Sequence, residues 1–219
     1  MGSIMVLLEL TKWVHASLGV VCLLSGVAAL IMPKRPRGHP WAGRIFGVSL
    51  GLLYLFILPN MIATRNVFLL AIGWLAVFAA FEGIQSLRRS LGRAEPRPGA
   101  LDYLVNGITV VFCLGLGGFG ALALRGGSFL GVVCLAFAVL GLLLVRAVRG
   151  RWREPPAPQV WLVAHIGMMC GAFSAALTAV LAVQFSGRLG GMEWVLWVAP
   201  SVAMQIVAQK QMKARGLTS

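Results

Sequence analysis

The strongest constraint on this sequence is a series of long, nearly uncharged apolar runs. Several of them approach the roughly 20 residues that a helix needs to cross a bilayer. Charged residues make up only 11% of the 219 residues and hydrophobic residues 59%, whereas a soluble domain is typically about one-quarter charged. Short segments of alternating polarity, which are typical of a membrane β-barrel, are missing. The sequence therefore predicts an all-α integral membrane helical bundle.

Charged or turn-forming clusters divide the apolar runs into seven expected transmembrane helices. Their approximate ranges are 13–32, 43–63, 66–87, 102–124, 127–147, 159–184 and 192–209. The first run is longer than the apolar core of a signal peptide, so we expect it to be a true span. The loops are too short to be domains. Residues 1–219 are therefore expected to form a single transmembrane domain.

Lysine and arginine are divided unevenly between the two sets of loops. All but four of the 19 basic residues lie in or next to the segments that follow the first, third, fifth and seventh spans. The four exceptions are Lys12, Arg65, Arg125 and Arg188. The positive-inside rule then predicts an outer N-terminus and a cytoplasmic C-terminus in the cell membrane. The net charge of +13 is expected to meet anionic lipid rather than nucleic acid. The bilayer is the expected partner, and a membrane-protein partner or a homo-oligomer is left open.

Small residues recur at every fourth position in two spans. Gly43, Gly47 and Gly51 share one helical face, as do Gly167 and Gly171, and such stripes allow close approach of helices in lipid. Spans two to three and four to five both end in arginine-rich segments, so a duplicated hairpin is one interpretation. The positive-inside rule acting on two unrelated hairpins is the other.

Polar side chains inside the spans are costly and are therefore candidates for function. Most of them fall in the cytoplasmic half, namely His39, Arg44, Glu82, Asp102, Asn106 and His165. We expect Glu82 to pair with Arg44 or to accept a proton from His165, since either lowers the cost of burial. A purely structural ion pair is the alternative. Asp102 is also a candidate N-cap residue.

The three histidines raise the alternative of a haem or metal site. His15 and His165 lie on faces of small residues, and intramembrane histidines are candidates for ligation. At 1.5 Å per residue, His15 lies about 25 Å and His165 about 9 Å from the inner ends of their spans, which disfavours one haem between them. His39 and His165 could meet at the inner rim. The cofactor therefore stays unknown, with haem b or a metal left open but not favoured.

Three stretches resemble a family of bacterial multi-pass membrane proteins of unknown function. They read "HASLGVVCLLSGVAAL", "HPWAGRIF" and "AHIGMMCGAFSAALTAVLAVQF". The residues that match the family's short motifs are His15, His39, Gly43, Arg44, His165, Met169, Thr178 and Ala179. Pro40, Met168 and Val180 depart from them, and Met168 replaces an arginine. The resemblance supports the three histidines as candidates and implies no activity.

Three function classes follow from these residues. The first is a small transporter-like protein or complex subunit that binds a proton, an ion or a small ligand at the cytoplasmic-side polar cluster. The second is a haem- or metal-binding redox membrane protein. The third is a structural subunit of a larger membrane complex, including a respiratory or photosynthetic one. Enzymatic activity is not favoured, because HExxH, GxSxG, P-loop and dinucleotide-binding motifs are missing.

Overall fold

Seven helices make up the described part of the chain. The computed structural model describes residues 2–33, 38–185, 187, 188, 190, 192 and 194–217. The helices are α1 (Gly2–Ile31), α2 (Gly38–Ala63), α3 (Val67–Ser90), α4 (Ala100–Arg125), α5 (Leu130–Arg153), α6 (Pro158–Phe185) and α7 (Trp194–Lys213). Lys34, Arg35 and Arg37, which contribute to the predicted orientation, lie outside the described residues.

Six helices, α1 to α6, are long and apolar enough to cross a membrane, in the part of the chain that the structure describes. This confirms a multi-pass helical membrane protein. The seventh helix is not among these spans. Gln205, Gln209, Lys210 and Lys213 fall in its second half and lower its hydropathy. Helix length and hydropathy therefore support the first six predicted spans but not the seventh.

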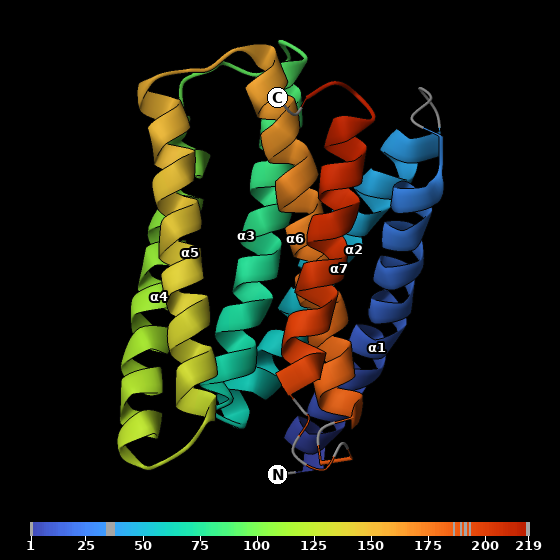
Figure 1. The fold of residues 1–219 in the computed structure, drawn as a ribbon. Coiled ribbons are helices and arrows are strands. Elements are labelled where there is room, and N and C mark those ends of the chain that lie inside the picture. Colours follow the sequence, from blue (N-terminus) through green and yellow to red (C-terminus); the bar gives the residue numbers. More distant parts are fainter. Residues whose placement is uncertain are drawn as a thin grey trace.

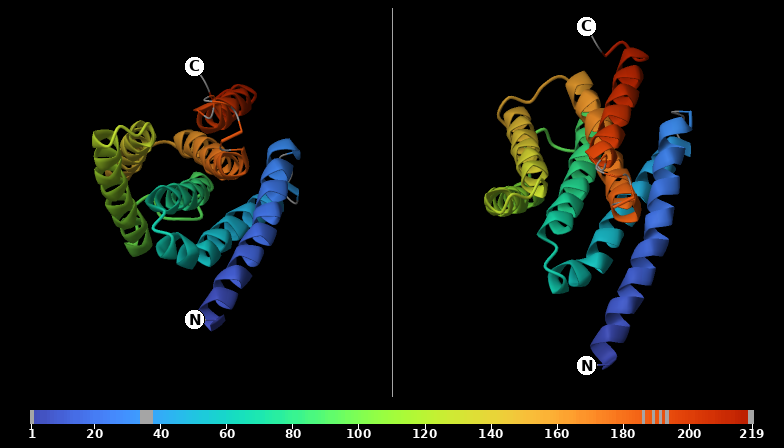
Figure 2. Two further views of the ribbon diagram at one scale, coloured as in Figure 1. Left: turned by 90° about the horizontal axis from the view of Figure 1, so that it is seen from below. Right: turned by 60° about the horizontal axis from the view of Figure 1, so that its bottom comes forward.

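The helices run alternately up and down, and α3 lies near the centre (Figures 1 and 2). The closest pairs are α1 with α2, α3 with α6, α4 with α5, and α6 with α7. The α1–α2 and α4–α5 pairs flank the central α3–α6 pair on opposite sides (Figure 2). The two hairpins compared in the sequence therefore differ in packing, because α4 and α5 pair closely whereas α2 and α3 each have a closer partner elsewhere.

Glycine explains the close approach of α4 and α5. A Cβ atom added at Gly131 would lie 2.6 Å from the Gly120 carbonyl oxygen, and one at Gly141 would lie 2.4 Å from Cys113 Sγ. The expectation for α6 is wrong, because a Cβ atom at Gly167 or Gly171 would meet nothing within 4 Å. The turn before α5 uses Gly127 at φ +76, a left-handed conformation that glycine adopts without strain.

Candidate functional site: a buried polar cluster beside a basic groove

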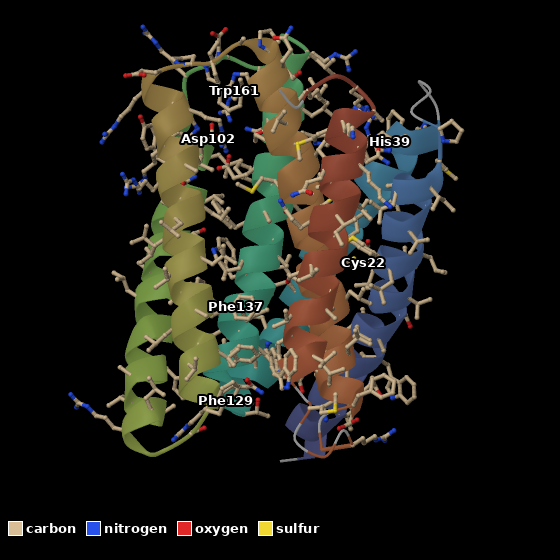
Figure 3. All side chains as sticks on the ribbon, in the orientation of Figure 1. Cys22, His39, Asp102, Phe129, Phe137 and Trp161 are labelled. Carbon is tan, nitrogen blue, oxygen red and sulfur yellow. The ribbon has the colours of Figure 1, made fainter. Side chains whose placement is uncertain are left out.

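Six of the predicted candidates gather near one end of the bundle, namely His39, Arg44, Glu82, Asp102, Asn106 and His165. The α3–α4 and α5–α6 connections lie at this end (Figure 1), and we call it the arginine-rich end because Arg88, Arg93, Arg149 and Arg153 belong to it. Figure 3 shows Asp102, Trp161 and His39 toward this end, whereas Phe129 and Phe137 lie toward the other. The structure divides the candidates at this end into two groups.

The first group is a buried polar cluster, which we define as Glu82, Arg89, Asp102, Asn106 and Arg151. Glu82 and Asn106 are both 0% exposed. Asn106 Nδ2 donates to Glu82 Oε1 at 2.9 Å and also lies 3.1 Å from the Asp102 carbonyl oxygen. The structure therefore brings together three of the predicted residues, from α3 and from the first turns of α4.

Arg89 and Asp102 form a buried ion pair within this cluster. Arg89 Nη2 lies 3.0 Å from Asp102 Oδ2, with side chains only 2% and 5% exposed. Arg89 Nε also donates to the Glu95 carbonyl oxygen at 3.1 Å. Burial of two charges is offset only when further hydrogen bonds satisfy them, and these contacts supply several.

Asp102 is not the N-cap residue of α4, contrary to the sequence prediction. Gly99 holds that position, and its backbone N–H donates to Asp102 Oδ2 at 2.8 Å. A carboxylate at the third helical position satisfies a donor at the helix start and interacts well with the positive end of the helix dipole. Asp102 therefore both fixes the start of α4 and neutralises the charge of Arg89.

Trp161 of α6 covers the two arginines of the cluster. The Arg89 guanidinium carbon lies 5.3 Å from the centre of the indole ring, and that of Arg151 lies 5.7 Å from it. Trp161 is itself only 3% exposed. Cation–π contacts strengthen when they are desolvated, so this ring joins α3, α5 and α6 around the charges.

Several atoms of the cluster are buried and have no hydrogen-bond partner among the described residues. They are Glu82 Oε2, Asn106 Oδ1, Arg89 Nη1, and Arg151 Nε and Nη2. Asp102, Arg89 and Arg151 all act electrostatically on Glu82. Buried polar atoms are rarely unsatisfied in folded proteins. The cluster therefore has donors and acceptors with which to hold a proton, an ion or a small polar molecule.

The second group consists of His39, Arg44 and His165, which line a groove among α1, α2, α3 and α6. The expected pairing of Glu82 with Arg44 or His165 is wrong. The Arg44 guanidinium carbon lies 5.6 Å from the centre of the Trp41 ring, and His165 Nδ1 lies 2.8 Å from the Gly83 carbonyl oxygen. The reason is the phase of α3, because Glu82 faces α4 whereas Ile84 and Arg88 line the groove.

All three histidines connect neighbouring helices. His15 Nδ1 lies 3.0 Å from the Leu53 carbonyl oxygen, and His39 Nδ1 lies 2.9 Å from that of Ala29. A carbonyl oxygen only accepts, so Nδ1 is the donor here, as it is in His165.

Among the described residues, the histidines belong to no larger group of metal-ligating side chains. Within the described ranges, no three His, Cys, Asp or Glu side chains form a group that could hold a metal ion. All four cysteines are buried, and none of them forms a disulfide bond. Haem b or a metal at His15, His39 or His165 therefore stays a prediction.

Sequence reasoning missed Arg89, Arg151 and Trp161 as members of the site. The two arginines contributed only to the predicted orientation, and Trp161 was not among the predicted candidates. One signal was present: Glu82, Ser86 and Arg89 have spacings of four and three, which places them on one helical face. All three are buried.

Comparisons with known proteins identify no family. No family model matches the chain, no curated protein matches it, and no solved structure matches it. The class that the fold defines is a multi-pass helical membrane protein.

Proposed function

We propose that this protein is a small transporter-like protein or membrane-complex subunit that binds a proton, an ion or a small ligand in the polar cluster. Glu82 is the group that carries the proton. In this proposal the membrane is a bacterial inner membrane. The distribution of lysine and arginine supports an outer N-terminus and a position of the polar cluster near the cytoplasmic surface. In this arrangement α7 is the seventh span, antiparallel to α6, and its polar second half faces the cytoplasmic rim.

The observation that carries the proposal is the environment of the Glu82 side chain. Glu82 is 0% exposed, and its Oε2 atom has no hydrogen-bond partner in the described part of the chain. Arg89 already pairs with Asp102, whereas Arg151 forms no ion pair among the described residues. An ionisable group at such a position marks a proton or ion pathway more often than a group on the surface does.

Protonation of Glu82 changes the charge balance of the polar cluster by one unit. Ionised Glu82 compensates the charge of Arg151. Protonated Glu82 leaves Arg151 Nε and Nη2, which are buried and unpaired, to attract an anion or a polar ligand. Proton binding and ligand binding are thereby linked, because each changes the free energy of the other.

The experiment is a pH jump applied to proteoliposomes on a solid-supported membrane. Wild-type protein is expected to give a transient charge movement, and Glu82→Gln is expected to abolish it. Glutamine keeps an oxygen for Asn106 Nδ2, so the unfolding temperature should stay close to that of the wild type. Glu154→Gln is the matched control, because Glu154 is an exposed carboxylate at the same end.

Arg151→Gln tests the linkage itself. The change is expected to shift the pH at which half of the charge moves, whereas Arg149→Gln on an exposed position of the same helix should leave it unchanged. An unaltered charge movement in Glu82→Gln would overturn the proposal. If that variant were only less stable than the wild type, the polar cluster would be a structural ion-pair network.

A further inference from the structure

The groove lies on the face of α3 opposite the polar cluster. At 100° per residue, Ile84, Arg88 and Leu91 point away from Glu82 and Arg89. The groove has a volume of about 500 Å³ and lies among α1, α2, α3 and α6, close to Gln211 near the end of α7. It is distinct from the polar cluster, and no part of the proposed proton chemistry uses it.

The groove has an apolar floor and a basic rim. The floor includes Phe46, Ile84, Met169 and Phe173, and the rim includes Arg44, Arg88, Arg93 and Arg215. The four arginines are exposed. The lining contains no aspartate or glutamate among the described residues.

Among the described residues, the rim arginines form no ion pair. The ion pairs of the described residues are Lys12 with Glu9 and Arg89 with Asp102, and neither involves the rim. Arg88 Nη1 donates to Gln85 Oε1 at 3.2 Å, which is a neutral partner. Four like charges around one recess raise the local concentration of anions, and guanidinium groups match phosphate geometry with paired N–H donors.

The position of the groove selects an amphiphile rather than a free anion. Its floor belongs to the membrane-spanning helices α2, α3 and α6, and its basic rim lies at their arginine-rich end. A phospholipid has the same arrangement of apolar and charged parts, because its acyl chains lie inside the bilayer and its phosphate lies at the bilayer surface. Basic pockets between transmembrane helices on the cytoplasmic side bind phosphate-bearing head groups in this way.

We propose that this groove binds one phospholipid whose head group carries two negative charges. The four arginines hold its phosphate oxygens, and one acyl chain lies over Phe46, Met169 and Phe173. A head group with two phosphates fits the four guanidinium groups better than a head group with one phosphate, because each phosphate then meets two guanidinium groups.

The experiment is a lipid titration of the purified full-length protein in neutral detergent, read out by native mass spectrometry. Cardiolipin, with two phosphates, is expected to bind more tightly than phosphatidylglycerol, and phosphatidylcholine least tightly. The double variant Arg44→Gln/Arg88→Gln should weaken cardiolipin binding by about 10- to 30-fold, since each cationic side chain near a lipid surface contributes about 1 kcal/mol.

Arg146→Gln/Arg149→Gln is the matched control. It removes the same charge from exposed positions at the same end, on α5, outside the groove. Its cardiolipin affinity should stay within about twofold of the wild type. An equal loss in both double variants would show general attraction of lipid to a basic surface, and the proposed site would then be wrong.

Gly43→Leu tests the shape of the groove without changing charge. Gly43 lines the groove, and a Cβ atom there meets nothing within 4 Å, so the leucine should occupy the recess while the fold is kept. Cardiolipin binding is expected to fall with an unchanged unfolding temperature. Retained binding would overturn the proposal, as would full displacement of the lipid by inorganic pyrophosphate.

Discussion

The polar cluster and the groove share one end of the bundle and one helix, yet they treat charge in different ways. In the polar cluster, Arg89 is 6% exposed and paired with Asp102. At the groove, its neighbour Arg88 is exposed and donates to the neutral Gln85. Arg88 and Arg89 are consecutive residues of α3, but they point in different directions. The charge of Arg89 must be compensated within the protein, whereas the charge of Arg88 can be compensated by a bound molecule.

This difference assigns separate tasks to the two faces of α3. The face with Glu82 and Arg89 is closed by α4 and by Trp161, so a change of charge there acts on the packing of the core. The face with Ile84 and Arg88 borders an open recess. Substitutions on this face are expected to change what the protein binds more than how stably it folds.

The largest expected effect comes from Arg89→Ala. It removes one partner of a buried ion pair and leaves Asp102 charged and buried, which should lower the free energy of unfolding by about 3–5 kcal/mol. The measurement is unfolding by sodium dodecyl sulfate in mixed micelles. Arg88→Ala, one residue away, should change the same quantity by about 0.5 kcal/mol or less. Equal losses in the two variants would contradict the comparison.

An intermediate effect is expected at the groove floor. Gly26→Ala would place a Cβ atom 2.4 Å from the Phe173 ring and 3.1 Å from the Phe46 ring, so aromatic side chains must move, at about 1–3 kcal/mol. Gly43→Ala, which meets no atom within 4 Å, should stabilise α2 by up to about 1 kcal/mol. Thermal unfolding in detergent measures both. A stabilising Gly26→Ala would show that α1 and α6 are farther apart than described.

The smallest expected effect belongs to His165→Ala. The variant loses the hydrogen bond to the Gly83 carbonyl oxygen, and bonds of this kind between membrane helices contribute about 0.6 kcal/mol on average. The change in unfolding free energy should therefore stay near or below about 1 kcal/mol. A far larger loss of unfolding free energy, or an absorption band present in wild-type protein and absent from the variant, would support the haem hypothesis for this histidine.

Much of the fold could be predicted from the sequence. Apolar runs and their basic ends indicate the helices, and the predicted span at 43–63 lies within Gly38–Ala63. The predicted final span at 192–209 overlaps Trp194–Lys213, but its hydropathy separates it from the other six. Length and hydropathy are local properties, so a sequence reveals them directly.

The site could be predicted only in part. Depth placed Glu82, Asp102 and Asn106 at one level, and they do meet. Depth alone also placed His165 and Arg44 there, although α3 stands between them and the polar cluster. Which face of a helix meets which neighbour depends on packing between distant segments, such as α3 with α6. No local pattern determines that pairing.

The central position of α3 has a consequence for the order of assembly in the membrane. Asp102 follows Arg89 closely in the sequence, so the ion pair can form as soon as α4 begins to emerge. His165 lies 82 residues after Gly83, and at about 5–20 residues per second of synthesis its helix arrives roughly 4–16 s later. During that interval the groove side of α3 lacks its principal helical neighbour. The bilayer, or an insertion chaperone, must shield it until synthesis of α6 completes the core.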